Sequence, residues 1–220
     1  MRLHISVDDG LVATLPKGTP VRLLHSFLED QKDWIHSTLN ELRPQRQRLE
    51  VERHTLPEQL KLRAFDHELR LCYEKQPGTR LRLIEREDSL LIRGQPEDPA
   101  KIHKALGSFV RRRAKAGLAE ELEQLSSHHG LPYRGLSIRR QKTRWGSCSA
   151  SGRINLNDKL IFLPRHLMQH VLLHELAHTR HLNHSGAFYQ LLHSLDPHTT
   201  RHHQALKEAG KYVPLWLRWA

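Results

Sequence analysis

Residues 174–178 read HELAH and carry the strongest chemical signal in the chain. On a helix, His174 and His178 lie one turn apart and differ in direction by about 40°, so both imidazoles project from one face. Two neutral imidazole nitrogens placed in this way can hold one zinc ion. Glu175 lies about 60° from His178, at the rim of the same face. It is therefore placed to accept a proton from a zinc-activated water, which is the chemistry of zinc hydrolases.

A catalytic zinc site needs a third protein ligand and keeps one position open for water. His184 extends the motif to HExxHxxxxxH. This spacing works if the helix ends near Leu182 and the chain turns back toward the metal. Asn183 tolerates the left-handed backbone conformation that such a turn needs. We therefore expect His184 to be the third ligand.

Other residues compete for this role. The rivals on the same helical face, or with a carboxylate to offer, are His170, His181, Asp196 and Glu208. A ligand from a different direction completes a tetrahedron better than a third one along the helix axis, which favours His184. A further group of histidines is interpreted as surface or supporting residues rather than as a second metal site; it comprises His193, His198, His202 and His203.

The elements that must position these side chains follow from periodicity and turn signals. The motif helix is expected from about Pro164 to Leu182, and Ser185 is expected to cap the next helix. Upstream, the expected elements are strands at 3–7 and 11–15 around Asp8-Asp9-Gly10, a helix over 20–43 ended by Pro44, a loop at 44–58, strands between 60 and 92, a helix over 98–129, and strands at 133–140 and 153–157.

This order of elements predicts an α+β fold. A strand-rich N-terminal region with one long helix, residues 1–95, precedes a zincin-like catalytic domain, residues 96–220, with HELAH on its central helix. Either the strand at 134–140 or the one at 153–157 is expected to be an edge strand that can pair with an extended peptide substrate.

Composition narrows the partners and the compartment. The 220 residues hold 35 Lys and Arg against 24 Asp and Glu, a formal net charge of +11, which favours anionic partners such as nucleotides or nucleic acid. The two cysteines make no disulfide framework and suit a reducing compartment. No signal-peptide pattern or membrane-spanning apolar run is present, so we expect a cytoplasmic protein.

Several segments together make the sequence similar to a known family. They are RRQKTRWGSCSASGRINLN at 139–157, LIFLP at 160–164, HELAHTRHLNHSGAFYQLL at 174–192, and the opening VDDGLVATLPKG. The chain resembles the YgjP-like zinc metallopeptidase family, which is related to the SprT-like group. The resemblance implies one zinc ion on His174, His178 and His184, with Glu175 catalytic.

The resemblance also places the RWGSCS segment, residues 144–149, on or beside a strand that borders the active-site helix. Trp145 is then a packing residue or a cleft wall, and Cys148 is a small buried residue rather than a ligand. Arg144 can stabilise developing negative charge, although a structural role is equally open. We take Arg144 and Trp145 as candidate substrate-binding residues.

Three functions fit these observations. The first is a zinc-dependent metallopeptidase with Glu175 as general base. The second is a zinc-dependent nucleoside triphosphate phosphohydrolase, since some YgjP-like proteins are associated with nucleotide pyrophosphate cleavage; the basic charge suits it, but a GxxxxGK phosphate loop is absent. The third is a non-enzymatic, basic nucleic-acid-binding module, which has no need of Glu175.

Overall fold

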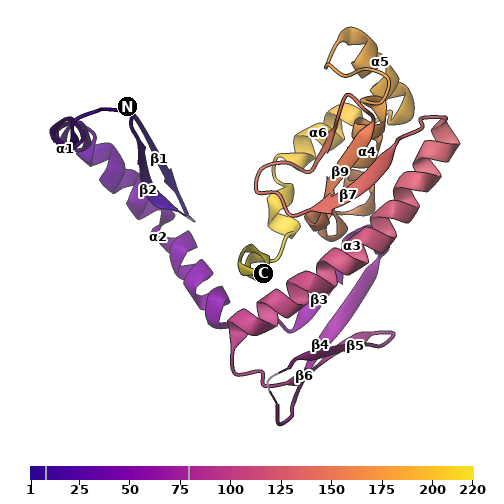
Figure 1. The fold of residues 1–220 in the computed structure, drawn as a ribbon, viewed down its shortest axis with the longest axis horizontal. Helices are drawn as coiled ribbons and strands as arrows, with labels where there is room; N and C mark the ends of the chain where they lie inside the picture. The colour runs from indigo at the N-terminus through magenta and orange to yellow at the C-terminus, as the bar shows by residue number, and fades with distance from the viewer. Residues whose placement is uncertain (8, 79) are drawn as a thin grey trace. The chain divides into compact units, whose positions relative to one another are not determined.

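The computed structural model describes residues 1–7, 9–78 and 80–220 (Figure 1). Helices and antiparallel and parallel strand pairs are mixed along the chain, which confirms the predicted α+β class. The chain divides into two compact units, residues 1–55 and 56–220. No helix among the described residues is both long enough and apolar enough to span a bilayer.

The first unit begins with a hairpin. Strands β1 (Arg2–Ser6) and β2 (Gly10–Thr14) pair antiparallel, close to the predicted strands, and Gly10 has a φ of 68° that suits glycine. Asp8 of the predicted turn lies outside the described residues. Helices α1 (Val21–Asp30) and α2 (Lys32–His54) follow, so the single helix expected over 20–43 is two helices.

Helix α2 also continues through Pro44, where the sequence predicted an end and a loop over 44–58. Proline in a helix interior removes one backbone hydrogen bond but does not always stop the helix. Here Ile35 and Leu49, on either side of Pro44, are both buried, and good helix formers follow the proline. Burial on both sides explains why the helix persists.

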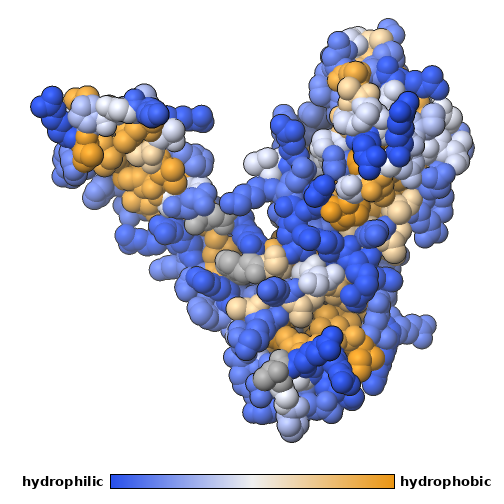
Figure 2. Space-filling view, in the orientation of Figure 1, coloured by the Kyte–Doolittle hydropathy of each residue, from blue (hydrophilic) through white to orange (hydrophobic). Residues whose placement is uncertain are grey.

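The first unit has a thin core. Ile35 and Leu49 are its buried hydrophobic residues among those described. Figure 2 shows hydrophobic surface on this unit, and its exposed large apolar side chains are Met1, Leu11, Val12, Val21, Leu23, Trp34 and Val51. Most of the hydrophobic stabilisation of the chain therefore belongs to the second unit.

The second unit starts well before the boundary predicted at residue 95. Its first sheet has the order β3-β4-β6-β5 and consists of β3 (Gln59–Leu62), β4 (His67–Lys75), β5 (Arg82–Glu85) and β6 (Ser89–Gly94), with η1 (Arg63–Phe65) after β3. Buried residues of these strands, such as Leu60, Leu69 and Ile92, share one hydrophobic cluster with the later helices. This shared core joins the sheet to the catalytic half, so the units divide at residue 55.

Helix α3 (Pro99–His129) runs along the second unit, with the four-stranded sheet beside its N-terminal half (Figure 1). The Asp98 side chain caps it by accepting from the Lys101 N–H at 3.2 Å, and Gly130, with a φ of 62°, ends it. The helix therefore has the predicted bounds. Its buried face, which includes Leu106, Phe109 and Leu118, packs into the main core.

The second sheet has the order β7-β9-β8 and consists of β7 (Gly135–Arg139), β8 (Gly146–Cys148) and β9 (Arg153–Asn157). Strand β9 pairs with β7 in parallel and with β8 antiparallel, so it has a neighbour on each side. Of the two alternatives, the strand at 134–140 is therefore an edge strand, as β7, and the strand at 153–157 is not. The edges of this sheet are β7 and the short strand β8, which lies in the RWGSCS segment that the resemblance placed on or beside a strand bordering the active-site helix.

The remaining elements are mostly short helices. They are η2 (Asp158–Phe162), α4 (Arg165–Ala177), α5 (Gly186–Leu195), α6 (Thr199–Leu206), η3 (Ala209–Tyr212) and η4 (Leu215–Trp219). Helix α4 packs against α3, β8, β9 and both α5 and α6. The HELAH motif thus lies on a helix held from several sides, as the fold prediction required.

Candidate metal centre and catalytic acid

Helix α4 divides HELAH between a core face and a cleft face. Leu172, Leu176 and Ala177 are fully buried, whereas His174 is only partly buried. The α-helix ends at Ala177 with His178 as its C-cap, earlier than the predicted Leu182. Backbone bonds from Thr179 to Leu176 and from Arg180 to Ala177 tighten the chain into turns there.

The chain then brings His184 back to the helix. Asn183 does not adopt a left-handed conformation, contrary to the expectation, because Asp66 is the only described non-glycine residue with positive φ. Ser185 caps α5 as predicted, and its Oγ accepts from the Phe188 N–H at 3.5 Å. The start of α5 thus holds His184 in place.

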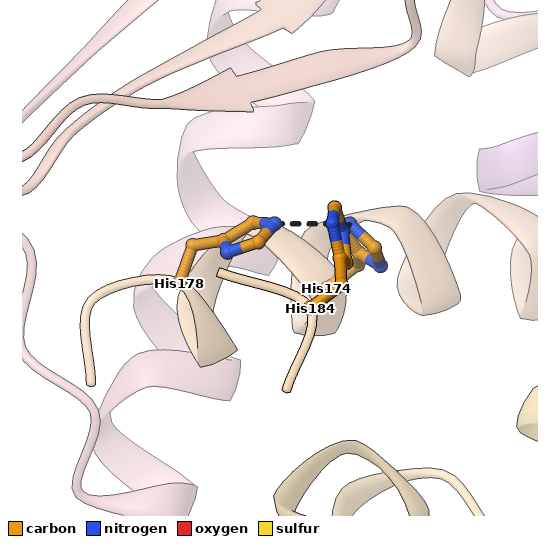
Figure 3. Close-up of side chains that lie close together, drawn as sticks. All are labelled: His174, His178 and His184. Atoms are coloured by element: carbon orange, nitrogen blue, oxygen red, sulfur yellow. Dashed lines mark hydrogen bonds between the residues drawn. The ribbon is translucent and has the colours of Figure 1, made fainter. Parts of the chain in front are cut away.

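The three imidazoles face one another (Figure 3). The Nε2 atom of His174 lies 3.2 Å from Nε2 of His178 and 3.2 Å from Nε2 of His184. All three ligand atoms lie within 4.8 Å of one another. The structure therefore brings together the three residues that the sequence predicted as metal ligands.

A buried aromatic ring supports the three imidazoles. The Phe188 ring centroid lies 5.0 Å from that of His174, 4.5 Å from that of His178 and 4.9 Å from that of His184. Phe188 itself is fully buried. The sequence analysis did not single out Phe188; its place four residues after the third histidine is the available signal.

The protonation of His178 is set by a neighbouring backbone carbonyl. Its Nδ1 lies 2.9 Å from the carbonyl oxygen of His181, so Nδ1–H donates and Nε2 keeps a free lone pair toward the other histidines. His181, a rival ligand in the sequence reading, thus contributes its backbone here. Burial, with smaller contributions from nearby histidines, lowers the pKa of His174 to about 3, which keeps that imidazole neutral.

The geometry fits a tetrahedral metal ion. Zinc binds imidazole nitrogen at about 2.0–2.1 Å, and two such ligands in tetrahedral geometry are about 3.3–3.4 Å apart. The observed separations of 3.2 Å are close to this value. Three imidazole nitrogens this close together are a donor set typical of a zinc site.

Glu175 lies under strand β8 with one oxygen unpartnered. The residue is 5% exposed, and its Oε2 atom is buried without a hydrogen-bond partner among the described residues. Burial raises the pKa of this carboxyl to about 8. A Cβ atom on Gly146 would lie 2.6 Å from Glu175 Oε1, so a larger residue at this point of β8 would require the Glu175 side chain to move. Sequence reasoning did not single out Gly146; its place in the strand segment RWGSC is the available signal.

Two cavities border this arrangement. One of about 220 Å³ is lined by Arg144, Trp145, Gly146, His170, Val171, His174, Glu175, His203 and Leu206. The other, of about 400 Å³, is lined by residues that include His174, His184 and Tyr189. Trp145 is partly buried and Arg144 is exposed, so both candidate substrate-binding residues line the cavity that Glu175 lines.

The other candidate ligands lie elsewhere. His170 and Asp196 belong to a separate cluster with His202, and exposed Glu208 pairs with Lys211 at 3.1 Å. Cys148 lies on β8, partly buried, and burial followed by the charge of Glu175 raises its thiol pKa. The group formed by His174, His178 and His184 therefore includes none of His170, Asp196, Glu208 and Cys148.

Comparison with known proteins identifies the family. No curated protein matches the chain. A solved structure described as the metallopeptidase zymogen of Pyrococcus abyssi abylysin aligns with 40% of this chain and 90% of that chain, at 23% identity and a TM-score of 0.37. At that distance the likeness assigns no role to any residue.

The family model described as the YgjP-like metallopeptidase domain matches residues 1–209. This range covers nearly the whole chain and all of the site described above. The chain therefore belongs to the YgjP-like family, and its metallopeptidase domain makes it a metallopeptidase-like hydrolase that is expected to use a metal ion, typically zinc.

Proposed function

We propose that the protein is a zinc-dependent peptidase. The observation that carries the proposal is the convergence of three imidazole Nε2 atoms beside a buried carboxylate with an unpartnered oxygen. Three imidazole nitrogens without a fourth protein ligand suit a catalytic site better than a structural one, which is usually closed by four protein ligands. Glu175, which a structural site does not need, supports the same conclusion.

His174, His178 and His184 would hold the zinc ion. When bound, zinc would polarise the scissile carbonyl and acidify a water molecule. Glu175 would accept the proton of that water and return it to the leaving amine. Its unpartnered Oε2 and its raised pKa suit a group that takes up and releases a proton near neutral pH.

Strand β8 can position an extended peptide next to the site. Trp145 O accepts from Asn157 N, and Ser149 N donates to Arg153 O, so alternate residues from 145 to 149 bond to β9. In an antiparallel pair the residues between them direct their N–H and C=O groups to the other side. Gly146 and Cys148 therefore present backbone groups at the free edge, beside Glu175, for a substrate strand.

A second candidate function rests on a basic cavity. It has a volume of about 430 Å³, and its lining includes Lys142, Arg144, Lys159, Lys207 and Arg218 but no carboxylate among the described residues. It shares Arg144, Trp145 and Leu206 with the cavity that Glu175 lines. A polyanion bound there would lie next to the proposed zinc, which favours hydrolysis of a nucleoside triphosphate as the alternative.

The test is Glu175-dependent turnover by zinc-loaded, tag-free protein, assayed in parallel on a denatured protein and on nucleoside triphosphates. Protein cleavage that is lost in Glu175→Gln, with zinc content unchanged, supports the peptidase. Exposed Glu208→Gln is the matched control and should keep full activity. Cleavage that survives in Glu175→Gln refutes the mechanism for either substrate.

A charge variant separates the two substrates. Lys207→Gln removes a cation from the basic cavity at an exposed position. It should raise the KM for a nucleoside triphosphate while leaving protein cleavage unchanged. Phosphate or pyrophosphate release that depends on both Glu175 and Lys207 would replace the peptidase proposal with the nucleotide one. If the protein only bound nucleic acid, its affinity would survive in Glu175→Gln and fall steeply with salt.

A further inference from the structure

A second cluster of ligand-type side chains is centred on Asp196. One carboxylate oxygen, Oδ2, lies 2.6 Å from Nδ1 of His170 and 2.8 Å from Nδ1 of His202. The other oxygen, Oδ1, accepts from the His198 backbone N–H at 3.0 Å. Asp196, in the turn between α5 and α6, thus joins α4, which carries His170, to α6, which carries His202.

This cluster is distinct from the three histidines next to Glu175. The ring centroids of His170 and His174 are 6.5 Å apart, and His170 directs its Nδ1 toward Asp196. The histidines beside Glu175 meet through Nε2 atoms, whereas this cluster meets through Nδ1 atoms and a carboxylate oxygen. Its three ligand atoms all lie within 4.8 Å of one another.

The surroundings are rich in imidazole. The His202 ring centroid lies 5.1 Å from that of His166, 5.6 Å from that of His170 and 5.9 Å from that of His198. The ion pairs of Asp196 within the described part of the chain are with histidines and not with Lys or Arg. Among the described residues, therefore, no Lys or Arg side chain occupies the place that a metal ion would take beside this carboxylate.

Two of the three side chains in this cluster are almost fully shielded from solvent. His170 is 2% exposed and Asp196 is 7% exposed. Thr199, next to Asp196 in the same turn, is also buried, and its Oγ1 has no hydrogen-bond partner among the described residues. Thr199 and His170 line one cavity of about 400 Å³, so the cluster can be reached from that cavity on its His170 side.

We propose that His170, Asp196 and His202 form a second metal site, for a divalent transition-metal ion such as Zn²⁺, Co²⁺ or Ni²⁺. Two imidazoles and one carboxylate are a donor set that these ions prefer over Mg²⁺ or Ca²⁺. To ligate, each imidazole would move its proton from Nδ1 to Nε2, and the separations of 2.6 and 2.8 Å from Oδ2 would widen to about 3.3 Å, the spacing of two ligands on one tetrahedral ion. The carboxylate would then supply the only charge. The sequence reading had treated His202 as a surface or supporting residue.

An ion at this site would fasten α6 and the turn at Asp196 to α4. His170 lies on α4 one turn before His174, so the ion would also fix the helix that carries the proposed catalytic ligands. The second site therefore adds stability to the catalytic helix. This inference does not depend on the proposed peptidase activity, because it concerns other ligand atoms.

The test is a metal titration of tag-free, chelator-stripped protein. Wild type, His184→Gln, Asp196→Asn, His202→Gln and the double variant His184→Gln/Asp196→Asn are dialysed against Co²⁺ and against Zn²⁺, and bound metal is measured by mass spectrometry. The wild type should take up one ion more than either Asp196→Asn or His202→Gln. The His184→Gln variant should keep the ion that the double variant lacks.

A matched control excludes loose binding by exposed histidines. His203→Gln changes the exposed neighbour of His202 on α6 and should bind as many ions as the wild type. His202 is only partly buried, so His202→Gln keeps the test valid if Asp196→Asn fails to fold. In the His184→Gln background, Zn²⁺ should also raise the Tm, and His202→Gln should abolish that rise.

The proposal is overturned if Asp196→Asn and His202→Gln, shown to be folded by circular dichroism, bind as many ions as the wild type. It is equally overturned if His203→Gln removes as much metal as His202→Gln does, because the binding is then adventitious. In either case the cluster is a hydrogen-bonded joint between α4 and α6 without a metal.

Discussion

Two buried carboxylates in the second unit have opposite surroundings. Asp158 is fully buried and its Oδ2 accepts from the Arg140 guanidinium, at 2.9 Å from Nε and 2.8 Å from Nη2. Each carboxylate has one buried oxygen without a hydrogen-bond partner among the described residues, Oδ1 of Asp158 and Oε2 of Glu175. Glu175 is almost as buried as Asp158, yet it forms no ion pair with a described residue. Ionised groups rarely stay buried without a partner, so the partnered acid fits a structural role and the unpartnered one fits chemistry.

The bonds of Arg140 show that the Asp158 region holds separate elements of the fold together. Besides Asp158, its guanidinium donates to the Gly107 carbonyl at 2.7 Å and to the Ala220 carbonyl at 2.7 Å. The end of β7, the N-terminal third of α3 and the last residue of the chain therefore meet at one side chain. Glu175, by contrast, does not join distant elements through ion pairs. It packs closely under Gly146 of β8, and both residues line a cavity.

The largest expected effect is a difference in turnover between two variants that carry the same acid-to-amide change, one at each carboxylate. Glu175→Gln should lower turnover by about 10²–10⁴-fold, the usual contribution of a general base. Asp158→Asn should leave turnover per folded molecule unchanged, because Asp158 does not line the catalytic cavity. The measurement is kcat for whichever substrate the zinc-loaded wild type cleaves, corrected for the folded fraction. Equal losses in both variants would remove the functional distinction.

The second prediction concerns stability. Arg140→Met should lower the free energy of unfolding by about 3–5 kcal/mol, because it leaves buried Asp158 with only the more distant and more exposed Arg111, at 3.8 Å, as a cationic partner. Exposed Arg139→Met, at the neighbouring position in β7, should cost less than about 0.5 kcal/mol. Urea unfolding of the full chain checks both values. Similar losses in the two variants would mean that the Arg140–Asp158 ion pair does not hold β7, α3 and the end of the chain together.

The third prediction uses the glycine above Glu175. In Gly146→Ala the new Cβ would lie 2.6 Å from Glu175 Oε1, so the carboxylate must move. A displacement of about 1 Å near reacting groups can cost about 10²-fold in rate. We expect that loss in kcat with zinc content unchanged. Gly186→Ala is the matched control, because nothing lies within 4 Å of its added Cβ. Full activity in Gly146→Ala would show that the position of Glu175 is not critical.

Helical spacing predicted that two histidines and a glutamate would share one helix face, because these residues are close in sequence. His174, Glu175 and His178 lie within one turn, and the Ser185 cap predicted the helix start that holds His184. The roles of Gly146 and Phe188 could not be read from spacing in the same way. The first depends on β8 packing against α4, a contact between segments far apart in the chain, and the second on the path of the turn after α4.

The fold class followed from the alternation of strands and helices, but two boundaries did not. Proline is the strongest local stop signal for a helix, yet burial of Ile35 and Leu49 carries α2 through Pro44. The strands between 59 and 94 looked like part of an N-terminal region, whereas Leu60 and Ile92 pack into the core built on α3 and α4. Both errors have one cause, since tertiary packing decides where local signals are ambiguous.

The smallest expected effect is the most direct comparison of the two acids. In metal-free protein Glu175→Gln should change the free energy of unfolding by less than about 1 kcal/mol, because no ion pair is lost and a neutral amide is less costly to bury than a carboxylate. Asp158→Asn should be clearly less stable than wild type, because Arg140 then lacks its counter-charge.

Urea unfolding of the chelated variants at neutral pH measures both free energies. If Glu175→Gln destabilised the chain as much as Asp158→Asn, Glu175 would be a structural acid with a partner in solution, and the loss of activity in that variant would no longer identify a general base. A stable but inactive Glu175→Gln, beside an active but unstable Asp158→Asn, would assign chemistry to one buried carboxylate and packing to the other.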